Sequence, residues 1–264
     1  MLAVAVACAV APAVPAAAAD DRGWTRLAHL SPDTSAVDIR VTDAGGAQVL
    51  RLDDVAYGVV SPYAALPAGR YRAVLVPAGE PSSSAPVLVA DLRIDSGVAV
   101  SAIVHGLNSD IEATVITDDL TRPPADHARI RIVQASARVP AVDVSTSTGV
   151  QVASALHRGE ATAYLDVPPG PWTLHLTGGG QAASVDVVVA EATASTLFVV
   201  DTADGGLAMI PVLDSAAIAD EPTGGLGTGG GWLAGRTDRA RTDGQVVERA
   251  APPRPALLRL RVPW

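Results

Sequence analysis

The stretch "SPDTSAVDIRV" (residues 31–41) has a partial echo in "SARVPAVDVST" (136–146). A second pair of segments repeats in the same order, since "GVVSPYAALPAGRY" (58–71) aligns with "GEATAYLDVPPGPW" (159–172). The offset falls from 105 to 101 residues between the two pairs, as expected when loops change length between copies of one fold. The sequence therefore predicts a tandem duplication.

A third pair of aligned segments supports the duplication, and a proline-containing segment between the copies predicts the linker. "ADLRIDSGVAVSAIV" (90–104) aligns loosely with "SVDVVVAEATASTLF" (184–198). We expect the two copies to meet near "TRPPADHA" (121–128), where two consecutive prolines stiffen the linker.

Short β-rich runs separated by turn residues fill both copies. "YRAVLV" (71–76) and "PVLVADLRI" (86–94) are typical, and "LPAGR" (66–70) is one of the turns between such runs. No stretch keeps a helical period. The pattern predicts an all-β protein of two tandem immunoglobulin-like antiparallel β-sandwich domains, over residues 24–120 and 128–214.

The two ends differ from this body. The first 19 residues are uncharged and apolar, contain two prolines and end in three alanines, which predicts a secretory signal peptide at 1–19 rather than a membrane-spanning helix. Because no Lys or Arg precedes Arg22, the true start could lie upstream of Met1. Cys8 could instead mark a lipoprotein, but little hydrophobic sequence precedes it. The cleaved chain would lack cysteine, so its stability would come from burial alone.

Residues 222–264 open with a glycine-rich linker and continue as an Arg-rich tail, which we expect to be disordered. A frame change that replaced an original anchor is the alternative. The whole chain has a formal net charge of −9, and its acids lie mainly before this tail. An acidic body disfavours binding to nucleic acid.

A Pro-x-Gly-x-aromatic block occurs in each copy. We expect Pro to restrict φ and Gly to supply a turn with positive φ before a strand that opens with an aromatic residue. The aromatic rings at these positions, together with Tyr63 and Tyr164, should be the largest packing units of each sandwich. The blocks are Pro67-x-Gly69-x-Tyr71 and Pro168-x-Gly170-x-Trp172.

One polar cluster invites a catalytic interpretation, because His29, Ser31 and Asp33 or Asp38 are the residue types of a hydrolase triad. In an extended segment, residues 29, 31 and 33 point the same way and do not converge. We therefore expect Ser31, Pro32 and Asp33 to form a turn, and Asp38 and its counterpart Asp143 to satisfy backbone donors. No residue is assigned to catalysis.

Metal and cofactor sites are also not expected. The five histidines are scattered along the chain, and no acidic cluster has the alternating pattern of a calcium loop. Weak calcium binding at acidic pairs such as Asp53-Asp54 or Asp118-Asp119 is the alternative to solvated loop acids. No glycine-rich segment stands between a strand and a helix as a nucleotide loop requires.

The first copy resembles the bacterial domain of unknown function 4397. The opening of that pattern is matched by His29, Ser31, Pro32, Asp33, Val37 and Asp38, and its middle by Ser61, Tyr63, Pro67, Gly69 and Tyr71. The second copy is more degenerate, with Gln134 in place of His29 and Thr162 in place of Ser61. The resemblance implies extracellular or cell-envelope β-sandwich modules, often in tandem, without an assigned reaction.

These features favour a secreted or envelope-associated, non-enzymatic, adhesion-like interaction module that needs no cofactor. Its partner would be an unknown envelope or extracellular protein or polysaccharide, and the module would be a monomer without a transmembrane anchor. Two alternatives stay open, namely a passive structural spacer and a hydrolase that uses the His29–Asp38 region. An interaction module should show an exposed patch or groove, a spacer neither, and an enzyme a pocket with converging titratable groups.

Overall fold

The computed structural model describes residues 21–124 and 126–216, and every regular element in these ranges is a β-strand. The predicted signal peptide (1–19) and basic tail (222–264) lie outside the described residues. Within the described ranges, no helix is long and apolar enough to cross a membrane.

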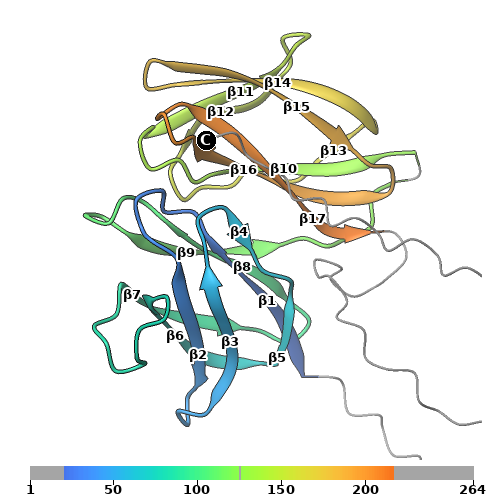
Figure 1. The fold of residues 1–264 in the computed structure, drawn as a ribbon. Coiled ribbons are helices and arrows are strands. Elements are labelled where there is room, and N and C mark those ends of the chain that lie inside the picture. Colours follow the sequence, from blue (N-terminus) through green and yellow to red (C-terminus); the bar gives the residue numbers. More distant parts are fainter. Residues whose placement is uncertain (1–20, 125, 217–264) are drawn as a thin grey trace, which may run out of the picture. The chain divides into compact units, whose positions relative to one another are not determined.

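Nine strands form the first sandwich (Figure 1). They are β1 (Arg22–His29), β2 (Val37–Asp43), β3 (Gln48–Val55), β4 (Val59–Val60), β5 (Ala64–Pro67), β6 (Gly69–Pro77), β7 (Leu88–Ile94), β8 (Ala99–His105) and β9 (Glu112–Asp118). One sheet has the order β4-β1-β8-β9, with β5 also paired to β1, and the other has the order β3-β2-β6-β7.

Eight strands form the second sandwich in the same arrangement. They are β10 (Ala128–Gln134), β11 (Ala141–Thr146), β12 (Gln151–His157), β13 (Leu165–Val167), β14 (Gly170–Gly178), β15 (Gln181–Val189), β16 (Thr193–Asp201) and β17 (Leu207–Ala216). The sheet orders are β13-β10-β16-β17 and β12-β11-β14-β15. A bridge between Val133 and Ala161 stands where β1 pairs with β4 in the first sandwich.

The all-β sandwich prediction is confirmed, with one difference in strand direction. β1 runs parallel to β8, and β10 runs parallel to β16, although we expected only antiparallel pairs. The chain leaves β1 for the opposite sheet and reaches β8 by a long crossover. Crossovers of this kind join parallel strands, whereas hairpins join antiparallel ones.

Each sandwich has an apolar core of its own. The core of the first contains Ile39, Leu75 and Leu92, and the core of the second contains Val144, Leu174 and Leu197. Burial alternates along β7, as expected for a strand with one face in solvent, but β8 is buried at every residue.

The continuous burial of β8 has a tertiary cause. A third apolar cluster joins the β1/β8 sheet to the β10/β16 sheet, and its fully buried members are Ala28, Leu30, Ile103, Val133, Ala135, Phe198 and Val200. These two sheets are therefore covered on both faces. The second face is the surface that the sandwiches share.

The repeated Pro-x-Gly-x-aromatic block closes on itself by a hydrogen bond. Tyr71 Oη donates to the Pro67 carbonyl oxygen at 2.5 Å, and Trp172 Nε1 donates to the Pro168 carbonyl oxygen at 3.1 Å. Gly170 has a φ of +132°, as the predicted turn requires, but Gly69 does not have a positive φ. Each glycine is the first residue of its strand, and in the first sandwich the bond from Tyr71 secures the crossing from β5 to the other sheet.

Replacing Tyr71 with Phe should lower the free energy of unfolding by about 0.5–1.5 kcal/mol, because the ring stays while the bond to Pro67 is lost. Replacing Tyr71 with Ala should cost about 3–5 kcal/mol, because the ring belongs to the first core. Denaturant unfolding of the full chain measures both. Equal losses for the two variants would contradict the assignment of most of the stability to the buried ring.

Candidate functional site

The opening signature forms a turn that is tied to a neighbouring loop. Ser31 Oγ lies 2.7 Å from Thr34 Oγ1, and Thr34 Oγ1 donates to Asn108 Oδ1 at 2.7 Å. Asp33 Oδ1 accepts the backbone N–H of Asn108 at 2.9 Å. Pro32 lies inside this turn, half-buried. The segment between β1 and β2 is thereby fastened to the loop that follows β8.

Asp38 and Asp143 make equivalent backbone contacts. Asp38 Oδ1 accepts the N–H of Asp54, and Asp143 Oδ1 accepts the N–H of Ala155, both at 2.9 Å. Asp54 and Ala155 have φ values of +53° and +46°, at register shifts of the β2–β3 and β11–β12 pairs. The hydrogen bond from Asp54 lowers the pKa of Asp38. Each carboxylate thus holds a β-bulge.

The residue types of a hydrolase triad do not converge on one another. His29 is buried, and its Nε2 lies 3.3 Å from the carbonyl oxygen of Ser35, whereas Ser31 and Asp38 bond to the groups described above. Burial lowers the pKa of His29. In the second sandwich, Gln134 stands in place of His29 and also bonds to the backbone, since its Nε2 donates to the Val139 carbonyl oxygen at 2.7 Å. This arrangement positions backbone and offers no nucleophile–base pair.

Ser61 and Tyr63, from the middle of the signature, also bond within the chain. Ser61 Oγ accepts the backbone N–H of Leu27 at 2.9 Å. Tyr63 Oη donates to Asp118 Oδ2 at 2.6 Å, and Tyr164 Oη donates to Asp214 Oδ2 at 2.7 Å. We expected Tyr63 and Tyr164 to be among the largest packing units of their sandwiches, but neither belongs to the two sandwich cores. Their hydroxyls need polar partners, and these partners lie between the sandwiches.

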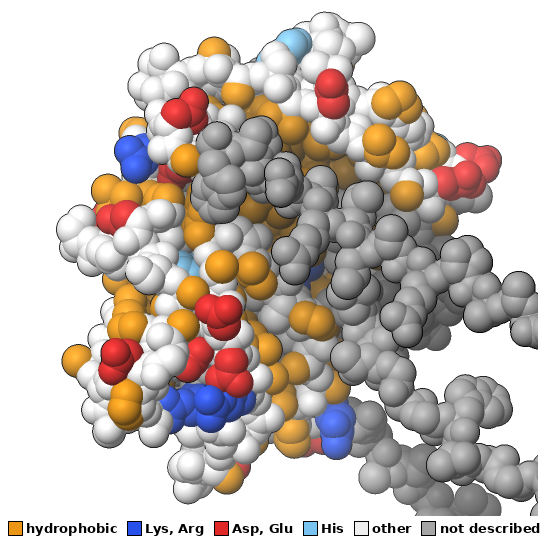
Figure 2. Space-filling view, viewed as in Figure 1, with side chains coloured by type: hydrophobic (Ala, Val, Ile, Leu, Met, Phe, Trp, Pro, Cys, Tyr) orange, Lys and Arg blue, Asp and Glu red, His pale blue; other side chains and the backbone are white. Residues whose placement is uncertain are grey.

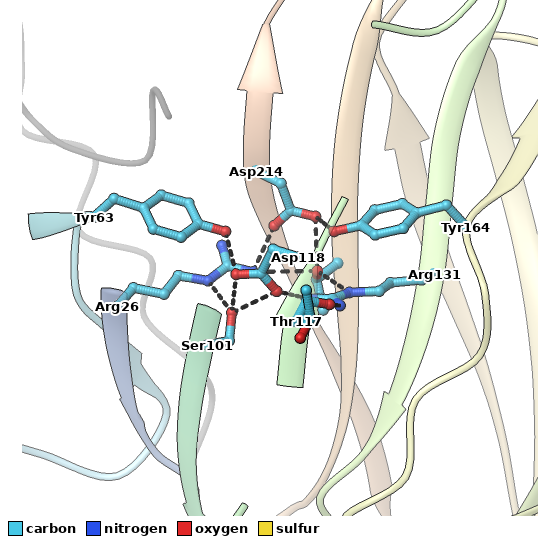
Figure 3. Close-up of polar contacts among 9 residues, drawn as sticks. Arg26, Tyr63, Ser101, Thr117, Asp118, Arg131, Tyr164 and Asp214 are labelled. Carbon is cyan, nitrogen blue, oxygen red and sulfur yellow. Dashed lines mark hydrogen bonds and ion pairs between the residues drawn. The ribbon is translucent and has the colours of Figure 1, made fainter. Parts of the chain in front are cut away.

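The two largest fully buried side chains of the described residues are arginines. The sequence analysis did not predict that either would be buried. Arg26 of β1 is 1% exposed and Arg131 of β10 is 2% exposed. Arg26 lies 2.6 Å from Asp214 Oδ1, and Arg131 donates to Asp118 Oδ1 (Figure 3). Each arginine therefore pairs with an acid of the other sandwich.

The same groups are also held within their own sandwich. Arg26 Nε donates to Ser101 Oγ at 2.7 Å, and Arg131 Nε donates to Thr196 Oγ1 at 2.8 Å. Ser101 and Thr196 in turn each donate to the acid of their own sandwich at 2.7 Å. We call these eight residues the Arg–Asp layer. Its members are Arg26, Tyr63, Ser101, Asp118, Arg131, Tyr164, Thr196 and Asp214.

Charge in the Arg–Asp layer is stabilised by pairing. Burial opposes the charge of Arg26, but Asp214, Tyr63 and Asp118 together outweigh this effect, and the pKa of Arg26 is raised. Burial raises the pKa of Tyr63 and of Tyr164, so both remain hydroxyl donors. The two guanidinium groups also lie over these rings, at 4.8 Å from each ring centre. The arginines and aspartates of the layer are buried, the two tyrosines at its edges are half-buried, and the layer holds the sandwiches together.

The solvent side of the first sandwich has an open groove of about 520 Å³ across β2, β6 and β7, which we call the β6–β7 groove. Arg70 lies directly opposite Arg93 in the strand pairing, and Arg72 lies opposite Asp91. Figure 2 shows charged side chains of both signs next to each other on this sandwich. The lining residues are Thr42, Asp43, Ala44, Gly46, Arg70, Tyr71, Arg72, Asp91, Leu92 and Arg93.

Three carboxylates of the acidic pairs considered for calcium have other partners. Asp53 pairs with Arg51 at 2.7 Å, Asp118 belongs to the Arg–Asp layer, and Asp119 pairs with Arg129 at 2.6 Å. In the part of the chain that the structure describes, no three His, Cys, Asp or Glu residues are grouped so that they could hold a metal ion.

The buried His29 generates a prediction about pH. Because its pKa is below the ordinary value of 6.5, the unfolded chain takes up a proton first as the pH falls below that value. The free energy of unfolding should therefore fall between about pH 7.5 and pH 5.5. His29→Gln, which copies Gln134, should reduce this slope. Thermal unfolding midpoints measured from about pH 7.5 to pH 5.5 test this pH dependence. An equal dependence in the variant would contradict its assignment to His29.

Three solved structures illustrate the comparisons with known folds. The Bacillus anthracis TIE protein is 13% identical with a TM-score of 0.24, and the match covers 67% of this chain but only 33% of that protein. A Bacteroides thetaiotaomicron protein of the DUF1812 group is 12% identical (73% and 95% covered, TM-score 0.22). A streptococcal virulence factor that binds α-glucan is 11% identical (67% and 92% covered, TM-score 0.21). Likeness at this level carries no argument about function.

No curated protein matches the chain. A family model does match, over residues 23–145, which comprise the first sandwich and the beginning of the second. A second family copy at 128–213 stays a prediction. The resemblance drawn from the signature of the first copy is confirmed, because the model that matches residues 23–145 is that of the family described as Domain of unknown function (DUF4397).

Proposed function

We propose that this chain is an exported, non-enzymatic binding module of the bacterial cell envelope, and that its β6–β7 groove binds an acidic polysaccharide. The chemistry recognised would be a carboxylate or a phosphate on the polymer. The apolar, alanine-ended N-terminal segment supports export. The groove supports binding, and its arginines support the acidic ligand.

The arginine pair across β6 and β7 is the observation that carries this proposal. Arg70 and Arg93 are both exposed and face each other across neighbouring strands. Like charges placed directly opposite destabilise a sheet. The Arg93 guanidinium is compensated by Asp95 at 2.9 Å, whereas the side chain of Arg70 has no ion-pair or hydrogen-bond partner among the described residues. A bound carboxylate or phosphate would relieve the repulsion and accept hydrogen bonds from the guanidinium groups.

The second sandwich provides an internal comparison. At the positions that correspond to Arg70 and Arg93, it has Pro171 opposite Val188. Val188 is 81% exposed, so this surface is apolar and uncharged there. The two sandwiches have the same strand order, and the fold therefore does not require arginine at this place. The facing arginines of the groove are thus not repeated at the corresponding positions of the second sandwich.

The two alternatives fit these observations less well. A hydrolase needs a nucleophile within reach of a base, whereas His29, Ser31 and Asp38 each bond to the backbone or to a neighbouring hydroxyl. A passive spacer needs no groove, and it would gain nothing from two facing arginines.

The proposal is tested with the purified full chain and immobilised polymers. Polygalacturonate supplies carboxylates, wall teichoic acid supplies phosphodiesters, and dextran supplies neither. We expect binding to one or both acidic polymers, none to dextran, and weakening with added salt. Replacing Arg70 with Ser and Arg93 with Val should weaken binding by about tenfold or more, since each lost charge-assisted bond contributes roughly 1.5–3 kcal/mol.

A matched control removes an arginine elsewhere on the same sandwich. Arg51 of β3 is exposed, pairs with Asp53 and does not line the groove. Arg51→Ser changes the net charge by one unit, the same change as Arg70→Ser or Arg93→Val made alone, and should leave binding nearly unchanged. Equal losses in the control and groove variants would reduce the effect to overall charge, and binding to dextran alone would overturn the proposal.

A further inference from the structure

The contacts of the Arg–Asp layer repeat when the two sandwiches are exchanged. Arg26 of the first sandwich meets Asp214 of the second, and Arg131 of the second meets Asp118 of the first. The supporting donors exchange in the same way, because Tyr63 and Ser101 hold Asp118 while Tyr164 and Thr196 hold Asp214. Corresponding residues of the two sandwiches thus occupy corresponding places in one interface.

The apolar contacts around the layer follow the same exchange. Ten of the fourteen members of the third cluster form pairs from corresponding strands of the two sandwiches, whereas Tyr57, Val200, Ala208 and Ile210 have no counterpart in it. These pairs are Ala28 with Val133, Leu30 with Ala135, Ile103 with Phe198, Val60 with Ala161, and Ile116 with Val212. Two glycine turns also correspond, since Gly58 faces Ile210 and Gly159 faces Thr114. The centre of the interface therefore has approximate twofold character, whereas its edge does not, because Arg158 pairs with Asp110 and Glu112 and its counterpart in the first sandwich is Tyr57.

In a symmetric homodimer, a residue i of one subunit contacts residue j of the other, and residue j of the first subunit contacts residue i of the second. The interface between the two sandwiches has this arrangement. It is self-complementary, because each surface carries both the donor and the acceptor that its partner needs. Here Arg26 and Asp118 lie on one sandwich, and Arg131 and Asp214 lie on the other. Neither sandwich is specialised as the basic or the acidic side.

We propose that the β1/β8 face of the first sandwich is a self-association surface, which pairs with a second copy of itself when the second sandwich does not occupy it. Arg26 of each copy would then meet Asp118 of the other. The exposed apolar residues around the pair would supply the driving force for association. The linker between the sandwiches would raise the local concentration of the partner face without forming the interface.

Both sandwiches have what they need to fold separately. Every strand pairing of the structure lies within one sandwich, and the first and second apolar cores draw on one sandwich each. The pairing of unlike sandwiches should nevertheless be the strongest. Phe198 of the second sandwich corresponds to the smaller Ile103 of the first. A dimer of two first sandwiches would therefore have Ile103 in place of Phe198, and its interface would be packed less fully.

The experiment uses the full chain with a protease site inserted after Pro124. After cleavage, we expect the two sandwiches to stay together in native mass spectrometry. When they are separated in denaturant, refolded and examined one at a time, the first sandwich should form a dimer at micromolar concentration. Asp118→Asn in that sandwich should raise the dimer dissociation constant about a hundredfold, because it leaves a buried arginine of the partner without its counter-ion.

A variant with exchanged charges distinguishes specific self-association from nonspecific aggregation. Combining Arg26→Asp with Asp118→Arg in the first sandwich restores opposite charges between two identical copies. Against the unchanged second sandwich, the same pair of substitutions sets like charges facing each other. We expect the exchanged sandwich to dimerise with itself and to lose the second sandwich as a partner. Circular dichroism verifies that each variant is folded, and Arg51→Ser serves as the neutral control.

Three outcomes would overturn the proposal. The folded first sandwich could remain monomeric while the cleaved pair stays together, which would show that the interface is not self-complementary. Asp118→Asn could leave the dimer unchanged, which would place the contact elsewhere. The exchanged sandwich, once shown to be folded, could bind the second sandwich as well as the original does. Each result is independent of whether the groove binds a polysaccharide.

Discussion

Arg26 and Arg131 can be buried inside this protein only because each meets a carboxylate from the opposite sandwich. Removing a guanidinium from water is costly unless an opposite charge and well-placed hydrogen bonds compensate. Here the acids are themselves fixed by a tyrosine and a hydroxyl residue of their own sandwich. The pairing of the two sandwiches is therefore a condition for burying these charges, and it explains why the β1/β8 and β10/β16 sheets are covered on both faces.

The residues that the two halves share act mainly on the chain itself. Asp38 and Asp143 hold bulges, and Tyr71 and Trp172 bond back to a proline carbonyl. These contacts preserve the sandwich and say little about ligands. The halves differ instead at the solvent-exposed positions opposite one another on β6 and β7, where arginines replace the Pro171 and Val188 of the second sandwich. Ligand binding is best sought where the copies differ, since the fold is maintained where they agree.

Much of the local structure could be predicted. "YRAVLV" and "PVLVADLRI" fall within or overlap β6 and β7, and the aligned anchors lie on corresponding strands of the two sandwiches. The Arg–Asp layer was missed, although a signal was present. An arginine interrupts an apolar strand in "WTRLAHL" and again in "ARIRIV", and an acid closes the last strand of the first copy and recurs near the end of the last strand of the second. Alone, such arginines resemble the solvent-facing residues of an alternating strand.

The sequence by itself determined that this is an all-β chain with repeated segments, because strand periodicity and turn residues act between near neighbours. Only the tertiary structure decided which sheet faces are hidden and what the polar residues do there. Whether Arg26 lies in water or beside Asp214 depends on a surface almost two hundred residues away along the chain. Burial and charge pairing are properties of two surfaces brought together, and a pattern within one strand does not contain them.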